Sequence, residues 1–479
     1  MQEIGIKKAA LFNAVSKYGT MVVQLGMTMI LSRLIVPEAY GIVAIVTVLI
    51  GFLSLFADLG LGINVVQHPD MNKDDINRLF TFSIITGLIL GGVMLFLSYP
   101  IAIFYGDEMY IKVCAILSVV PFLNTLNVVP NAILTRDKRF DIIAIRSILC
   151  TIVSGAIAVV LAILGWGVYA LIYQSIISAL FLFIWNYCQC PLTLQRFNCN
   201  QIFHLLGSYS LYQVLFNFLN YFTRNLDNLV IGKLFGSSDL AYYNKSYYLN
   251  LYPNNIFTSV ITGVLHPYIR DYKDNIRELC IKYIQIEKIL SILGILSMMV
   301  FFWCSNEVVL IMFGKNWGPS GLCLKCLSIC MWTQIMCSVS GSLFLGLRRT
   351  DQTFKCGIIN LILIVISIVC GYYAKSINVL ALCIGFSYNL IFVITNYILI
   401  NKTMKMSLLS FLSNFLFDAF FVFGFIIITL FIPVISDNIW MSLLIKLVII
   451  LVTYSAYILI SGQYIVLLSL LNSLKHYGK

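Results

Sequence analysis

The chain has 479 residues, of which 60% are hydrophobic and 11% are charged, and its mean hydropathy is +0.93. Soluble domains carry about 25% charged residues, so this composition excludes a water-soluble globular protein. The formal net charge of +11 leaves two interpretations open, a nucleic-acid partner or the charge asymmetry of a membrane protein.

Apolar segments of membrane-spanning length follow one another along the whole chain. A helix needs about 20 apolar residues to cross the hydrocarbon core of a bilayer. Fourteen such segments are separated by short polar stretches, with centres near residues 22, 50, 90, 121, 153, 177, 217, 251, 294, 334, 365, 388, 420 and 450. We therefore expect an all-α integral membrane protein with about fourteen transmembrane helices.

The chain begins with the short basic stretch MQEIGIKKAALFNAV, and the helix expected after it contains Lys17 and Gln24. No small-x-small cleavage pattern follows. We therefore interpret this segment as an uncleaved first span rather than a signal peptide.

Basic residues are distributed unevenly between the two sides of the predicted membrane. Stretches before the first span and after even-numbered spans hold 20 Lys and Arg residues, Arg146 among them, and stretches after odd-numbered spans hold 5. Cytoplasmic loops carry such an excess of basic residues. The asymmetry predicts that both termini are cytoplasmic. It also excludes a nucleic-acid partner, for which the sequence offers no contiguous basic surface.

The fourteen cysteines mostly lie inside predicted spans, where cysteine behaves as a small hydrophobic residue. Two groups lie elsewhere, the pair Cys323 and Cys326 and a loop cluster of Cys188, Cys190, Cys199 and His204. Neither group supplies the second pair of ligands that a tetrahedral zinc site requires. We expect packing roles for both groups, and no metal or cofactor.

The first and seventh predicted spans resemble each other at an offset of 200 residues. LSRLIVPEAYGIV from Leu31 aligns with IGKLFGSSDLAYY from Ile231, which places Arg33 on Lys233. The helix before each block has polar residues at the same five positions, spaced by three or four residues and so on one face. These residues are Asn13, Lys17, Thr20, Gln24 and Thr28 in the first helix and Gln213, Asn217, Asn220, Arg224 and Asn228 in the second.

This repeat predicts the domain organisation. Spans 1–6 (residues 1–200) and spans 7–12 (residues 201–404) are two copies of one six-helix lobe in the same orientation, a parallel repeat. Spans 13 and 14, with the cytoplasmic tail, occupy residues 405–479 outside the repeat. Two such lobes are typical of transporters whose substrate path lies at the interface between the repeats.

Polar side chains in the seventh span need an explanation, because a charged residue in a spanning helix faces the bundle interior or a water-filled cavity. Arg224 and Asp227 could pair at i+3 while the amides tie helices together. Alternatively, Lys17 and Gln24 of span 1 line a hydrated cavity with span 7, where Asp227 partly compensates the positive charge. The residues of span 7 in this second interpretation are Gln213, Asn217, Asn220, Arg224, Asp227 and Asn228.

Such a cavity suits an anion that carries many hydroxyl groups. Arginine binds phosphate through two parallel hydrogen bonds. Asn, Gln and Thr side chains supply the donors and acceptors that sugars need.

Four further cations and one acid are candidate residues of the cavity or of ion coupling. Arg33 and Lys233, at the outer ends of spans 1 and 7, either line the cavity or snorkel to lipid phosphates. Lys245 and Lys325, also near outer ends, are weaker cavity candidates. Asp58, near the inner end of span 2, either pairs helices or couples an ion, and Asp227 is the other ion-coupling candidate. The charges of DNIRELCIKYIQIEK, before span 9, are expected on a solvated cytoplasmic face.

Residues 31–62, LSRLIVPEAYGIVAIVTVLIGFLSLFADLGLG, resemble the polysaccharide transporter (Wzx-type) family of O-antigen, capsule and exopolysaccharide flippases. The resemblance is carried by Arg33-Leu34, Pro37-Glu38, Tyr40-Gly41 and Asp58-Leu59-Gly60. It continues through RDKRF, GWGVYAL, RNLDNLVIGKLFG and FGKNWGP, at residues 136–140, 165–171, 224–236 and 313–319. One departure is Ala241-Tyr242, where the family usually has Gly-x-Tyr.

The resemblance implies the fold of the multidrug/oligosaccharidyl-lipid/polysaccharide (MOP) exporters, with two six-helix lobes, alternating access and a cationic central cavity. It implies a cargo of undecaprenyl-pyrophosphate carrying an oligosaccharide repeat unit, moved to the periplasmic leaflet of the bacterial inner membrane. Membrane lipids, a polysaccharide polymerase and a chain-length regulator are the partners that it suggests. The membrane potential alone, protons or sodium remain open as the driving force.

Three alternatives remain. A multidrug or organic-cation antiporter of the same superfamily should prefer an acidic cavity, whereas this one is net basic. A lipid II flippase shares the fold but fits the quoted motifs less well. A membrane-embedded polymerase or ligase usually carries a long outer loop with catalytic residues, and no outer loop here is long. We therefore expect a transporter and not an enzyme.

Overall fold

A computed structural model describes residues 6–58, 60–68, 70–195, 211–272, 275–432 and 436–464. All regular secondary structure within these ranges is helical. Contacts divide the chain into two compact units, residues 1–241 and 242–479, and each unit is described by itself. The predicted all-α class is confirmed.

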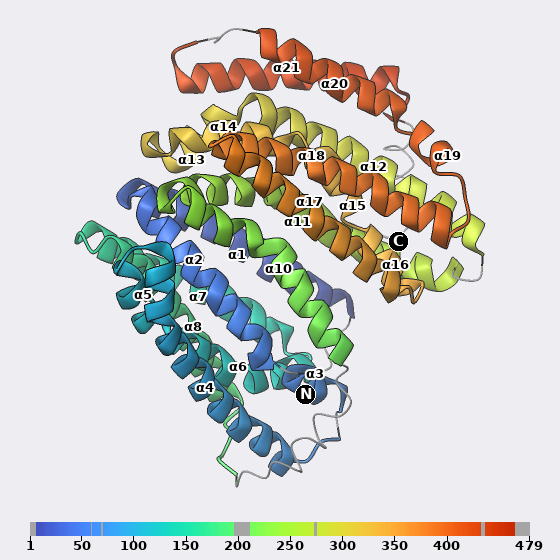
Figure 1. Ribbon diagram of the computed structural model, residues 1–479. Coiled ribbons are helices and arrows are strands. Elements are labelled where there is room, and N and C mark those ends of the chain that lie inside the picture. Colours follow the sequence, from blue (N-terminus) through green and yellow to red (C-terminus); the bar gives the residue numbers. More distant parts are fainter. Residues whose placement is uncertain are drawn as a thin grey trace. The chain divides into compact units, whose positions relative to one another are not determined.

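The first unit is a helix bundle (Figure 1). In it α1 packs along α7, α4 along α6, α7 along α8, and α10 along α2. Its helices are α1 (Ile6–Leu34), α2 (Pro37–Asp58), α3 (Leu61–Gln67), α4 (Lys73–Tyr105), α5 (Met109–Leu117), α6 (Val119–Arg136), α7 (Phe140–Ile163), α8 (Val168–Gln189) and α10 (Leu211–Leu234).

The second unit is built around α12 (Ile276–Trp303), which packs against α14, α15, α20 and α21 and supplies many side chains of the core. The boundary between the units falls within α11 (Ser237–Tyr272). The other elements are α13 (Ser305–Phe313), the 3-10 helix η1 (Lys315–Trp317), α14 (Gly318–Ser328), α15 (Met331–Cys337), α16 (Ser340–Gly346), α17 (Thr350–Tyr373), α18 (Ile377–Asn396), the π-helix η2 (Tyr397–Thr403), α19 (Leu408–Ser413), α20 (Leu416–Phe431) and α21 (Ile439–Ile460).

Within the described ranges, nine helices are long and apolar enough to cross a membrane. The helices Lys315–Ser328 and Met331–Gly346, bent by 56°, make a tenth span if they are counted together. The chain is thus a multi-pass membrane protein. All fourteen predicted centres lie in helices. The count of fourteen spans remains a prediction, because α20 has only 16 residues and α1, α10 and α11 carry many polar side chains.

Helix α10, which the repeat assigns to the second lobe, belongs to the first compact unit. Phe52 of α2 contacts Phe218 and Phe222 of α10, with ring centroids 5.5 and 5.4 Å apart. The Tyr221 hydroxyl donates a hydrogen bond to the carbonyl of Val48. The boundary between compact units therefore differs from the boundary at residue 200. A unit defined by contacts does not test an internal repeat, so the predicted lobes remain a prediction.

Gly41 allows an unusually close helix crossing in the first unit. A Cβ at this position would lie 1.8 Å from the backbone oxygen of Ser237, which is the first residue of α11. The Tyr110 hydroxyl lies 3.4 Å from the Ser237 side-chain oxygen at the same crossing. The glycine of the Tyr40-Gly41 motif thus has a steric explanation, because any larger residue at position 41 would push α2 away from α11.

Candidate functional site

Two of the polar residues predicted on α1 lie at exposed positions, whereas Thr20 and Thr28 are half-buried. Lys17 and Gln24, seven residues apart and so on one face, are both exposed. Other α1 residues pack on α7, where a Cβ at Gly155 would lie 2.6 Å from the Met27 side chain. Helix α1 therefore packs against α7 on one side, and Lys17 and Gln24 lie on its exposed surface together with apolar residues such as Val22.

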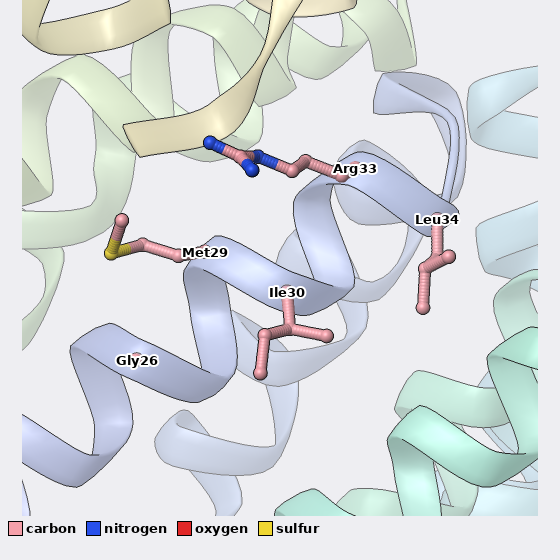
Figure 2. A pocket seen from close by; sticks show the side chains of 5 residues that line it. All are labelled: Gly26, Met29, Ile30, Arg33 and Leu34. Atoms are coloured by element: carbon pink, nitrogen blue, oxygen red, sulfur yellow. The ribbon is translucent and has the colours of Figure 1, made fainter. Parts of the chain in front are cut away.

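Arg33 lies in a pocket at the C-terminal end of α1, with a volume of about 420 Å³. Figure 2 shows the Arg33 guanidinium projecting to the same side of the helix as the Met29 thioether. The lining residues are Gly26, Met29, Ile30, Arg33 and Leu34. A cation beside apolar side chains is suited to an amphiphile, because the cation can hold an anionic headgroup while the apolar wall contacts hydrocarbon.

On α10 the structure separates the predicted polar residues into two groups. Asn220 and Arg224, one turn apart, are exposed, and Asn217 is half-buried. Asp227 and Asn228 are 4% and 5% exposed. The Asp227 carboxylate accepts a hydrogen bond of 2.8 Å from the backbone N–H of Asn228. Asp227 therefore does not share the exposed surface of Arg224.

Arg224 has no hydrogen bond, ion pair or ring contact with any residue in the described part of the chain. The i+3 ion pair with Asp227, which the structural interpretation requires, is not formed. A guanidinium in a helix expected to cross the membrane needs water or an anion nearby. Arg224 is thus available to a ligand in this conformation.

Lys233 is fixed at the end of another helix. Its ammonium donates a hydrogen bond to the carbonyl of Phe104 and lies 5.1 Å from the centroid of the Phe104 ring. The carbonyls at a helix C-terminus lack intrahelical donors and carry partial negative charge, so a lysine stabilises them. Lys233 therefore caps α4 here, which is a role that neither interpretation of the sequence anticipated.

The candidates Gln213 and Asp58 lie in the helices α10 and α2, but their side chains are outside the described part of the structure. The sequence provides the only argument for these two residues.

Lys245 and Lys325 lie over aromatic rings in the second unit. The Lys245 ammonium is 5.6 Å from the centroid of Phe313 and 5.7 Å from that of Trp317. Both rings belong to the FGKNWGP segment, so this segment supplies the cation–π partners of Lys245. Lys325 lies 5.1 Å from the ring of Phe302. Such cation–π contacts stabilise a cation away from bulk water.

A buried arginine was missed by the sequence analysis, which counted Arg146 among loop cations. Arg146 lies within α7, is 6% exposed and donates to the side-chain oxygens of Asn131 (3.0 Å) and Asn186 (2.5 Å). The Asn186 amide in turn donates to Asn127 at 2.6 Å. The signal in the sequence was the set of asparagines in α6 and α8, because neutral amides can hold a guanidinium away from water.

The family model described as "Polysaccharide biosynthesis protein" matches residues 30–322, more than half of the chain. The chain belongs to this family. The match includes Arg33, the polar residues of α10, and Lys245 with the rings of Phe313 and Trp317. The resemblance to polysaccharide transporters that the motifs carry is confirmed.

Two relatives carry informative names. The succinoglycan biosynthesis transport protein ExoT of Rhizobium meliloti is 25% identical over 322 residues, which are 64% of this chain and 62% of ExoT. The alignment thus spans less than two thirds of that relative. The lipopolysaccharide biosynthesis protein WzxC of Escherichia coli is 21% identical over 363 residues, which are 71% of this chain and 70% of WzxC.

Solved structures show the fold. The lipid II flippase MurJ in an inward closed conformation matches with a TM-score of 0.73 at 14% identity, over 95% of this chain and 99% of MurJ. A multidrug resistance MATE family transporter of the MOP superfamily, inward-facing, matches with a TM-score of 0.63 at 17% identity, over 78% of this chain and 92% of that one. The predicted exporter fold is confirmed.

Proposed function

We propose that this chain is a flippase that moves undecaprenyl-pyrophosphate-linked oligosaccharide repeat units from the cytoplasmic to the periplasmic leaflet of the bacterial inner membrane. Membership of the polysaccharide biosynthesis family and the names of the relatives ExoT and WzxC support this cargo class. The fold shared with a lipid II flippase supports movement of a lipid-linked sugar. Both termini are cytoplasmic in this proposal, and the chain transports its cargo without converting it chemically.

The exposed, unpaired guanidinium of Arg224 is the observation that carries the binding mechanism. Arginine can bind two phosphate oxygens at once, which replaces part of the hydration of a pyrophosphate. Asn220, one turn away, and Asn217 supply amide groups for sugar hydroxyls. Lys17, Gln24 and Arg33 are the corresponding exposed residues of α1.

The charge of the cargo also bears on the driving force. With the cell interior negative, outward movement of an anion is favoured by about 2.3 kcal/mol per charge per 100 mV. Arg224 and Lys17 would compensate the pyrophosphate charge while the cargo crosses the low-dielectric region. A net-basic site also fits this cargo better than an organic cation.

We predict that Arg224→Ala abolishes surface polysaccharide at normal protein amounts, because the pyrophosphate loses its bidentate partner. Arg224→Lys should restore export only in part, since the lysine ammonium keeps the charge but lacks the planar guanidinium that binds two phosphate oxygens at once. The measurement is surface polysaccharide, together with lipid-linked oligosaccharide on the cytoplasmic leaflet, in a deletion strain that carries each variant. Arg277→Ala is the matched control, because Arg277 is an exposed arginine in the first turn of α12.

Two results would contradict the proposal. Full export by Arg224→Ala would remove Arg224 from the binding site. Normal surface polysaccharide in the deletion strain, combined with rescue of a strain depleted of its lipid II flippase, would assign the chain to lipid II instead.

A further inference from the structure

Glu287 is a fully buried acid in α12 that no step of the proposed function uses. Its side chain is 0% exposed, and neither carboxyl oxygen has a hydrogen-bond partner among the described residues. Neighbouring α12 residues Tyr283, Ile286 and Leu290 belong to the hydrophobic core. Burying an ionised carboxylate without partners costs several kcal/mol. The Glu287 carboxyl is therefore uncharged here and holds a proton.

This burial corrects the expectation for DNIRELCIKYIQIEK. Arg277 and Glu278 are exposed, as a solvated face requires, but Glu287 is enclosed. Helix α12 runs without interruption from Ile276 to Trp303, so the acid lies three turns inside a helix that other helices surround. The sequence pattern could not reveal this, because the helices that cover Glu287 come from distant parts of the chain.

Among the described residues, no basic side chain forms an ion pair with Glu287, and this includes Lys288 beside it in α12. The titratable groups that interact with it are Tyr283, one turn earlier, and Cys337 at the end of α15. Lys325, Glu307 and Lys446 lie near the other end of α12, by Phe302 and Trp303, about 22 Å along the helix. The other titratable groups on the helices packed against α12 are Cys323, Cys326, Asp418, Tyr454 and Tyr457.

A second buried acid of the same unit behaves differently. Asp418 of α20 is 1% exposed, but its carboxylate accepts hydrogen bonds from Ser291 (2.5 Å), Tyr457 (2.7 Å) and Gln463 (2.7 Å). These three donors hold the carboxyl group in place, so we interpret Asp418 as a structural residue. Asp227, the candidate from the sequence, also accepts hydrogen bonds, from Asn228. Glu287 differs from both because, in the part of the chain that the structure describes, no donor lies in hydrogen-bonding geometry to either carboxyl oxygen.

Tyr283, one turn before Glu287, is hydrogen-bonded to the residue that precedes a π-helix. The Tyr283 hydroxyl donates a hydrogen bond of 3.1 Å to the side-chain oxygen of Asn396. Asn396 is the last residue of α18, directly before the π-helix Tyr397–Thr403. π-Helical turns are rare and occur frequently at functional sites. If this turn rearranges, Tyr283 can turn its hydroxyl from Asn396 to an ionised Glu287.

We propose that Glu287 is the proton-carrying residue that couples this transporter to proton movement, an inference that rests on the proposed flippase function. In the buried conformation its carboxyl O–H bond is intact. When the second unit admits water, this bond breaks, the proton passes to water, and the carboxylate accepts a hydrogen bond from Tyr283. Reprotonation is needed before the residue is buried again, so each conformational cycle binds and releases one proton.

Infrared spectroscopy of the purified protein tests the first part without any transport assay. The C=O stretch of a protonated carboxylic acid is separate from the bands of carboxylates. We expect the wild-type protein to show this band at neutral pH and Glu287→Gln to lose it. Glu278→Gln, which changes an exposed acid of the same helix, should keep it. Identical spectra of the wild-type protein and Glu287→Gln would overturn the proposal.

Transport measurements test the coupling. In a deletion strain, Glu287→Gln should reach normal amounts but lose polysaccharide export at every external pH, because it cannot release a proton. Glu287→Asp keeps an ionisable group and should retain export with a shifted pH profile, whereas Glu278→Gln should match the wild-type protein. Wild-type export and pH profile in Glu287→Gln, or dependence on sodium instead of pH, would overturn the proposal.

Proteoliposomes that enclose a pH-sensitive dye separate this proposal from the proposed function. We expect proton uptake by the wild-type protein under an imposed pH gradient, and none by Glu287→Gln. If the deletion strain makes normal polysaccharide but the proteoliposomes show proton uptake that depends on Glu287, the proposed flippase function is wrong and the proton site remains. If polysaccharide export needs the protein but the proteoliposomes show no proton uptake, only the proton site is wrong.

Discussion

At the scale of single residues, Arg224 and Glu287 are both without a hydrogen-bond partner among the described residues, but in opposite surroundings. Arg224 is exposed, whereas Glu287 is enclosed. Charged and polar groups inside membrane proteins are costly, so residues without partners are the ones that function explains best. We accordingly propose that Arg224 binds the cargo and that Glu287 carries the proton.

The ion pair between Glu307 and Lys446 shows the structural alternative. The Lys446 ammonium lies 2.6 Å from the Glu307 carboxylate, which also accepts a hydrogen bond of 2.8 Å from Ser442. Burial alone would raise the pKa of Glu307, but these partners outweigh it, so the pKa lies below its ordinary value of 4.5. The ion pair between Glu307 and Lys446 thus links α13 to α21.

The lowered pKa of Glu307 predicts how stability depends on pH. Because the folded-state value is depressed, the pair contributes its full stability above the ordinary value and loses it as the pH falls through the folded value. Melting temperatures of the purified protein should show Glu307→Gln less stable than the wild-type protein at neutral pH. The difference should shrink on acidification, and a constant difference would contradict the ion pair as its cause.

At the scale of helices, the crossing at Gly41 leaves the least room for a side chain among the glycines in the described part of the chain. We predict that Gly41→Ala destabilises the protein by about 1–3 kcal/mol, because the added methyl group meets the Ser237 oxygen and forces α2 from α11. Thermal unfolding in detergent measures this. Gly92→Ala in α4 is the control, since a Cβ there meets nothing within 4 Å and alanine favours a helix. Equal melting temperatures for the two variants would contradict the steric explanation.

Helix positions could be predicted from the sequence far better than helix partners. Long apolar runs identified the regions of all fourteen predicted helices, because membrane-spanning length is a local property. Local periodicity agrees with the exposure of Lys17 and Gln24 in α1 and of Asn220 and Arg224 in α10, but not with the burial of Asn228. The separation of Arg224 from Asp227, the contact of Lys233 with Phe104 and the enclosure of Glu287 did not, since each depends on which distant helix packs alongside.

At the scale of the whole molecule, the C-terminal helices α20 and α21 lie outside the predicted repeat but share the core of the second unit. Core residues of this unit include Phe411, Phe425, Ile450 and Tyr457. The hydroxyl of Tyr454 donates to the backbone of Ile292 in α12 at 2.8 Å. The pair is therefore integral to the unit and is not an appendage.

We predict that deletion of residues 405–479 prevents the second unit from folding, because it uncovers α12 and removes the acceptor of Ser291. The truncated protein should aggregate or be degraded in membranes, as size-exclusion chromatography in detergent would show. Removal of residues 465–479 alone is the control, because it leaves α20, α21 and Gln463 in place. A monodisperse protein that lacks 405–479 would contradict this role of the pair.

The Asp418 network ties the C-terminal helices to α12 and α15 through one hydroxyl group. The Ser291 hydroxyl of α12 donates to the carboxyl group of Asp418 in α20, and its oxygen accepts a hydrogen bond of 2.8 Å from the indole N–H of Trp332 in α15. Loss of this single hydroxyl would therefore leave two buried polar groups on different helices each short of one partner.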